Sequence, residues 1–235
     1  MTIISDNHNF VFIHIPKCGG SSIEIEFERL VKWGDFVVGS TPQGYKLEKI
    51  FSNLFGVDKH TPPSKLKQIL GDKWGLYKKV TIVRHPKKII ESYYKFGKRR
   101  EKEICKNRNI SREELLKDIA NERKFAPVWM FNQTKGVMID AITSENFNQY
   151  LDKVADERWG NFFDEYVFSH ELDHVLKLEN PLEIRSFFKN NIDENFELRH
   201  ENISKSEKLI WNDDHLGKYK TLLSDTCNKL GYQFD

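Results

Sequence analysis

This chain of 235 residues has few cysteines, no long apolar run and a small net charge, and each of these features excludes a class of protein. The three cysteines, Cys18, Cys105 and Cys227, are odd in number and far apart. This pattern fits a reducing compartment and matches neither a disulfide framework nor a zinc site. No apolar run approaches the roughly 20 residues that a membrane-spanning helix needs.

The formal net charge of +2 is too small for a protein that coats a polyanion, although it leaves room for a local basic cleft. The first nine residues lack the basic and apolar segments of a secretory signal peptide. We therefore expect a cytoplasmic protein with no nucleic-acid or membrane partner, and the sequence does not indicate its oligomeric state. Its length suits one domain, residues 1–235, with a sizeable core.

Short apolar runs alternate with segments of helical period along the chain. The expected strands are 10–15, 77–83 and 175–178. Helices are expected after Ser21 or Ser22, from Ser64 to a stop at Gly71, from Pro86 onward, and over 111–121, 147–154, 181–189 and 214–230. The helix over 111–121 is expected to begin with a capping box of Ser111 and Glu114. Residues 34–58 show no clear period and are expected to form a loop-rich connection. The alternation predicts an α/β fold with a parallel sheet and ligand-binding loops at the carboxyl ends of its strands.

The most informative stretch is 10–22, where an apolar run leads through Pro16 into a short polar turn. The turn consists of Lys17, Cys18, Gly19, Gly20, Ser21 and Ser22. Glycines let the backbone approach an anion, helix N-terminal amides and the helix dipole favour negative charge, and the lysine adds a full positive charge. The pattern indicates a phosphate-binding loop, and an ordinary strand-to-helix turn is the alternative when the loop is taken alone.

The order of residues in this loop disfavours the common nucleotide-binding patterns. A Walker A loop carries its lysine after the glycines, whereas Lys17 precedes them, and the dinucleotide pattern G-x-G-x-x-G is missing. Cys18 suggests a cysteine phosphatase, but that chemistry needs an arginine shortly after the cysteine, and Glu24 stands there.

A second anion-binding element follows the strand expected at 77–83. Arg84 stands at the strand end, and Ser92 lies eight residues later on a helix that begins near Pro86. At about 1.5 Å of rise per residue, Ser92 is only about 9 Å along that helix. An arginine fork and a serine hydroxyl can therefore meet on one further phosphate group, although each residue alone is more often structural.

Together, the two segments resemble the PAPS-dependent sulfotransferases. In that family a P-K-[TS]-G-[GT]-[TS]-[TS] loop binds the 5′-phosphosulfate of 3′-phosphoadenosine 5′-phosphosulfate (PAPS), and an arginine and a serine in an R-x-P-x-x-x-x-x-S frame bind the 3′-phosphate. The start Ile-His-Ile-Pro-Lys is similar to the carbohydrate (heparan 2-O-like) branch and its bacterial relatives. The resemblance implies a P-loop-like three-layer fold with a central parallel sheet flanked by helices.

The resemblance also implies sulfuryl transfer from PAPS to an acceptor hydroxyl on a carbohydrate, with PAP as product and no metal. Lys17 is then the leaving-group stabiliser, and Cys18 departs from the Thr or Ser of the family. His60 is the expected base, because an imidazole titrates near neutrality and carbohydrate sulfotransferases place a catalytic histidine between the two segments. The implied nucleotide-binding residues are Lys17, Cys18, Gly19, Gly20, Ser21, Ser22, Arg84, Ser92, Ser204 and Lys205.

Several residues keep a structural interpretation beside a functional one. His60 has a surface or helix-capping role as its alternative, His14 is expected to be a core histidine, and His200 is a weaker candidate base. The charged run 98–108 is expected to be a solvated helix end or loop, with an anionic-acceptor site as the alternative. Five aromatic residues are expected to lie in the core rather than to stack on a sugar: Trp129, Phe131, Trp159, Phe162 and Phe163. A P-loop-type kinase using ATP and a non-catalytic nucleotide- or polyanion-binding domain are the competing functions.

Overall fold

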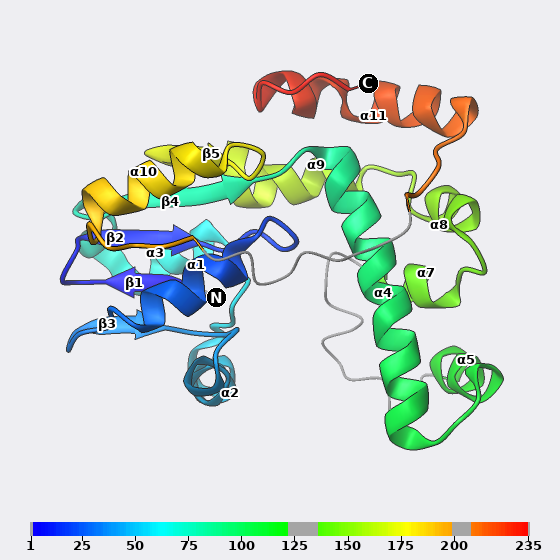
Figure 1. Ribbon diagram of the computed structural model, residues 1–235, viewed down its shortest axis with the longest axis horizontal. Helices are drawn as coiled ribbons and strands as arrows, with labels where there is room; N and C mark the ends of the chain where they lie inside the picture. Colours follow the sequence, from blue (N-terminus) through cyan, green and yellow to red (C-terminus); the bar gives the residue numbers. More distant parts are fainter. Residues whose placement is uncertain (1, 122–135, 199–207, 235) are drawn as a thin grey trace. The chain divides into compact units, whose positions relative to one another are not determined.

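The structure is a computed structural model that describes residues 2–121, 136–198 and 208–234 (Figure 1). Its contacts divide the chain into two compact units. The first unit comprises Met1–Arg84 and Phe163–Ser204, and the second comprises His85–Phe162 and Lys205–Asp235. The expected single domain, residues 1–235, stays a prediction.

A five-stranded mixed sheet forms the centre of the first unit. Its strands are β1 (Ile3–Ser5), β2 (Phe10–Ile13), β3 (Asp35–Val37), β4 (Lys78–Val83) and β5 (His174–Lys177), in the order β3-β1-β2-β4-β5. Strands β2, β4 and β5 are parallel, whereas β1 is antiparallel to both of its neighbours. The carboxyl ends of the three parallel strands therefore meet at one edge, which is where an α/β sheet binds its ligands.

Helices pack against this sheet, and the hydrophobic core of the unit lies between them and the strands. Around the sheet lie α1 (Gly20–Glu28), α2 (Pro42–Phe55), α3 (Pro63–Leu70), the 3-10 helix η1 (Gly71–Gly75), the π-helix η3 (Asp164–Phe168) and α10 (Pro181–Asn191). Ile23 and Phe27 of α1 and Phe188 of α10 pack on the strand residues Phe10 and Phe12. The structure thus confirms the expected α/β fold and its three parallel strands, each shifted by one or two residues from the predicted bounds.

The expectation for residues 34–58 is wrong, because this segment contains β3 and the helix α2. Thr41 caps α2 by accepting a hydrogen bond from the Gly44 amide at 3.0 Å, and Pro42 occupies the first helical position. Gly56 ends the helix with a φ of 65°. Gly44, which donates to the helix cap, and Gly56, which ends the helix, made the segment resemble a loop. Strands β1 and β3, with three residues each, are too short for a sequence pattern. They form by pairing, β1 with both β2 and β3, and β3 with β1.

The second unit is helical. It contains α4 (Pro86–Arg108), α5 (Arg112–Ala120), α7 (Val137–Thr143), α8 (Phe147–Lys153), most of α9 (Arg158–Phe163) and α11 (Asp213–Lys229). The predicted capping box of Ser111 and Glu114 is present at the start of α5, and Gly231 follows α11 with a φ of 66°. None of the described helices combines the length and apolar character that crossing a bilayer requires.

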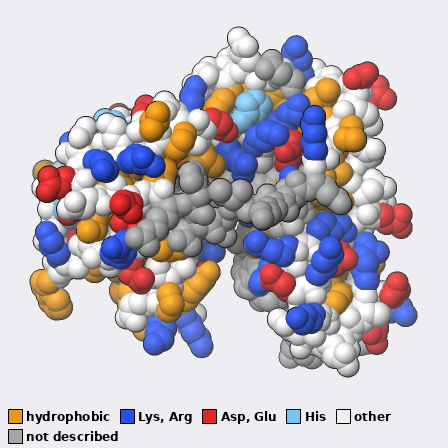
Figure 2. Space-filling model, viewed as in Figure 1, with side chains coloured by type: hydrophobic (Ala, Val, Ile, Leu, Met, Phe, Trp, Pro, Cys, Tyr) orange, Lys and Arg blue, Asp and Glu red, His pale blue; other side chains and the backbone are white. Residues whose placement is uncertain are grey.

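The charged run 98–108 forms the C-terminal half of α4 rather than a loop. Acidic side chains lie among the basic ones on the surface of this unit (Figure 2). Ion pairs join Lys98 to Glu101 at 2.8 Å, Arg100 to Glu103 at 2.6 Å, and Arg108 to Asp118 at 2.7 Å. This internal pairing favours the solvated-face interpretation of the run over an anionic-acceptor site.

A close contact between α4 and α7 gives a prediction for stability. A Cβ atom at Gly97 would lie 2.5 Å from the Cβ of Ala141, whereas nothing lies within 4 Å of a Cβ at Gly217 in α11. We expect Gly97→Ala to lower the free energy of unfolding by about 1–3 kcal/mol through overpacking. The matched control Gly217→Ala should raise it by about 0.5–1 kcal/mol. Urea denaturation measures both, and equal stability of the two variants would contradict the packing.

Candidate functional site

The candidate site lies at the carboxyl edge of the parallel strands in the first unit. Lys17 follows β2, Arg84 follows β4, and Glu179 follows β5. The Arg84 guanidinium donates from Nη1 to the Lys17 carbonyl at 3.4 Å, which ties the ends of two strands together. The structure therefore brings one residue of each predicted anion-binding segment into contact.

Two residues of the loop have a left-handed backbone conformation. Lys17 has a φ of 67°, which is uncommon for a residue with a side chain, and Gly19 has a φ of 81°. The Cys18 amide donates to the Ile15 carbonyl at 3.3 Å, and this bond closes a turn. The contact from Arg84 holds the Lys17 peptide in its strained conformation, because such conformations persist only where the surroundings impose them.

Both glycines are required by close packing on the side of the loop that faces the protein. A Cβ at Gly19 would lie 2.6 Å from Cδ1 of Leu178. At Gly20 it would lie 2.6 Å from Nε2 and 2.7 Å from Cγ of His14, so the face of that imidazole supports the loop. The loop is therefore pressed against the end of β2 and the residue after β5.

The start of α1 supplies backbone donors for an anion. Gly19 is the N-cap residue and has no side chain with which to cap the helix. The Ser22 amide donates to the Gly19 carbonyl at 3.1 Å, whereas the amides of Gly20 and Ser21 are the first two of the helix and have no intrahelical acceptor. These two amides and the helix dipole favour negative charge at the loop. The Ser21 hydroxyl lies 2.9 Å from that of Ser40.

Cys18 points into the protein, with only 1% of its surface exposed. Burial raises the pKa of its thiol far above the usual value, Arg84 opposes this shift, and Glu179 adds to it. The thiol is therefore protonated at neutral pH and has no nucleophilic character.

His60 is half-buried and is oriented by two hydrogen bonds. Its Nδ1 lies 3.1 Å from the His14 carbonyl, and its own carbonyl accepts from the Tyr166 hydroxyl at 2.6 Å. Because a carbonyl only accepts, Nδ1 carries the proton and the lone pair of the ring lies on Nε2. Burial is the main cause that lowers the pKa of His60 well below its usual value, so the ring is unprotonated at neutral pH.

His14 is a buried histidine, as expected, and it contacts both the loop and His60. Its Nδ1 is paired with Oε1 of Glu24 on α1, and its ring lies edge-to-face with the His60 ring at 4.6 Å between centroids. The pair with Glu24 was not predicted. The sequence carried one partial signal, a glutamate beside the core residues Ile23 and Phe27 on the buried side of a helix, which does not identify the partner.

Other residues that bear on the predictions belong to further elements or lie outside the described residues. Ser92 is on α4 in the second unit, where it follows the buried Glu91. His85 caps α4 by accepting from the Lys87 amide at 3.2 Å, which is a structural role. Trp159, Phe162 and Phe163 are buried core residues, as expected. Ser204, Lys205, His200, Trp129 and Phe131 lie outside the described residues.

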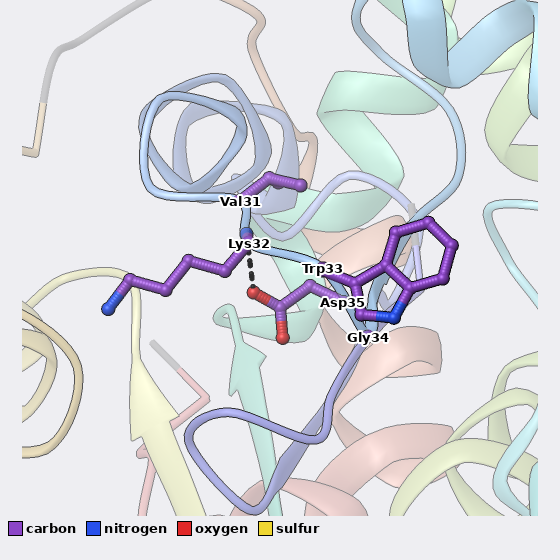
Figure 3. A pocket seen from close by; sticks show the side chains of 5 residues that line it. All are labelled: Val31, Lys32, Trp33, Gly34 and Asp35. Atoms are coloured by element: carbon purple, nitrogen blue, oxygen red, sulfur yellow. Dashed lines mark hydrogen bonds between the residues drawn. The ribbon is translucent and has the colours of Figure 1, made fainter.

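A surface pocket of the first unit lies away from this chemistry. It is lined by Val31, Lys32, Trp33, Gly34 and Asp35, in the connection between α1 and β3 (Figure 3). The Lys32 amide donates to Asp35 at 2.9 Å, and the Trp33 side chain is fully exposed. This connection follows the C-terminus of α1, whereas the phosphate-binding loop precedes its N-terminus.

Comparison with known families agrees with the two sequence segments and the fold. The model of the sulfotransferase family matches residues 1–226, and the chain therefore belongs to that family. The match spans both compact units and indicates a transferase that moves a sulfuryl group. Searches of curated proteins and of solved structures gave no significant match.

The burial of Cys18 gives a prediction about thiol reactivity. In the native protein, Ellman's reagent should modify the partly exposed Cys105 first, whereas Cys18 should react only after unfolding, because its thiol is buried and protonated. Mass mapping of the labelled peptides measures this order. Fast native labelling of Cys18 would contradict its placement.

Proposed function

We propose that this protein transfers the sulfuryl group of PAPS to a hydroxyl of a saccharide acceptor, with His60 as the base. The observation that carries the proposal is the meeting of the Lys17 loop, Arg84 and, through His14, His60 at one edge of the sheet. The saccharide rests on the resemblance of residues 13–17 to the carbohydrate branch. The cysteine pattern favours a cytoplasmic location.

The loop would bind the 5′-phosphosulfate. The amides of Gly20 and Ser21 and the hydroxyls of Ser21 and Ser22 supply donors, and Lys17 adds a positive charge beside them. We assign Lys17 to the bridging oxygen, where negative charge grows as the bond to sulfur breaks. Because Lys17 and Arg84 neutralise the anion, this assignment requires no metal.

Arg84 and Ser92 would bind the 3′-phosphate, as the spacing of their motif implies. Ser204 and Lys205 would add late contacts to the nucleotide. The support for these assignments is the order of the two motifs along a chain that belongs to the family, together with the contact between Arg84 and the loop.

His60 would take the proton of the acceptor. The acceptor oxygen attacks sulfur as its O–H bond breaks, the proton moves to Nε2 of His60, and the bond from sulfur to the bridging phosphate oxygen breaks. The pair of electrons from that bond stays on the leaving phosphate. The support is the Nδ1–H tautomer, which leaves a lone pair on Nε2, and a lowered pKa that keeps the ring unprotonated.

Calorimetric titration of 3′,5′-ADP, the desulfated product, tests the nucleotide site against the kinase alternative. We expect 3′,5′-ADP to bind and Mg·ATP not to bind. Arg84→Ala should weaken binding by roughly 10- to 100-fold, because it removes hydrogen bonds to a charged group. Arg185→Ala, an exposed arginine on α10, is the matched control and should bind like the wild type. Binding of Mg·ATP without 3′,5′-ADP would refute the proposal.

The pH dependence of labelled-sulfate transfer tests the base. A base acts when unprotonated, so kcat/KM should fall with decreasing pH only below 6.5, since the pKa of His60 is lowered from that value. His60→Ala should reduce kcat by about 100- to 10,000-fold while 3′,5′-ADP still binds. His174→Ala, at the opposite end of β5, is the matched control. Unchanged turnover in His60→Ala would remove it as the base.

A further inference from the structure

His14 connects three parts of the candidate site. It lies just after β2 with 4% of its surface exposed, and the face of its ring supports Gly20 of the loop. Its carbonyl accepts the Nδ1–H of His60 at 3.1 Å, and the two rings lie at 66° to each other. His14 therefore contacts both the loop and the proposed base, through its ring and its backbone carbonyl.

Glu24 holds His14 in this position. Its carboxylate is fully buried on α1 and pairs through Oε1 with the His14 Nδ1. Burial lowers the pKa of His14 to about 4, so a neutral ring donates its Nδ1–H to the carboxylate. Burial alone would raise the pKa of Glu24, but the contact with His14 opposes this effect, and that pKa lies below its usual range.

Packing alone gives no reason for a carboxylate at this position. Replacing a buried polar pair by apolar side chains of similar volume is often neutral or stabilising, and Ile23 and Phe27 beside Glu24 already fill the core. The pair does, however, fix orientation. An imidazole turns easily about its Cβ–Cγ bond, and the hydrogen bond to Glu24 selects one setting of the ring.

We propose that Glu24 and His14 are positioning residues, and that the buried pair sets the place of His60 relative to the phosphate-binding loop. This inference rests on the proposed function, because it assumes that His60 is the base. Neither residue touches the reacting atoms. Both act through His60, and a small misplacement of a catalytic group is enough to slow a reaction by about 100-fold.

The test uses Glu24→Gln, which keeps the shape but removes the charge, and His14→Phe, which keeps a flat ring but removes Nδ1. We expect each to lower kcat by about 10- to 100-fold while the Kd for 3′,5′-ADP changes by less than about threefold. Glu28→Gln, the same change near the end of α1, is the matched control and should leave kcat unchanged. Circular dichroism verifies that each variant is folded. If one variant fails to fold, the other still tests the inference.

Repeating the two substitutions in the His60→Ala variant separates a positioning role from a merely structural one. If the pair acts through His60, the same substitutions should change the residual rate of His60→Ala by less than about twofold. In histidine NMR of the 3′,5′-ADP complex, the His60 ring should lose its pure Nδ1–H tautomer in Glu24→Gln. Additive losses of rate, or an unshifted His60 ring signal, would overturn the inference.

The outcomes also separate this inference from the proposed function. An active wild type with both variants within about twofold of its kcat would overturn the positioning role alone. A wild type that neither binds 3′,5′-ADP nor transfers a sulfuryl group would overturn the proposed function, and the positioning role with it.

Discussion

The face of the His14 imidazole lies so close to Gly20 that no side chain fits between them, and the geometry of the loop depends on this contact. On the neighbouring residue, Leu178 imposes the same limit at Gly19. The two glycines are therefore needed for packing as well as for backbone freedom, since they let the loop lie flat against the ends of β2 and β5. With its inner side fixed in this way, the loop holds the partly exposed residues Lys17, Ser21 and Ser22 near the ends of these strands.

Three histidines in this chain show how surroundings decide the role of one side chain. His14 is buried against a carboxylate and stays neutral, so that it serves as a support. His60 donates its Nδ1–H to a carbonyl and keeps a lone pair on Nε2, which suits a base. His85 uses Nδ1 to accept from the Lys87 amide and Nε2 to contact the Gln233 carbonyl, which suits a helix cap. Composition alone treats the three as equivalent.

The sequence predicted the parts of the fold whose signals are local. The three parallel strands are continuous apolar runs, and the capping box at Ser111 is a short-range pattern, so both could be found. The helix α2 was missed because its glycines resembled a loop, and β1 and β3 because three residues carry no period. In the site, the motifs placed Lys17 and Arg84 at strand ends. The pair of His14 and Glu24 could not be predicted, because it depends on which side of α1 meets the end of β2.

The burial of Cys18 bears on the one departure of this loop from the family pattern. A threonine or serine at this position offers a hydroxyl, and a thiol is a poorer donor. The Cys18 side chain, however, points into the protein, where a small apolar group packs at least as well as a hydroxyl. Its backbone amide closes the turn on Ile15 whatever the side chain. A cysteine here therefore leaves the turn and the outer side of the loop intact, and the donors for an anion come from the residues that follow it.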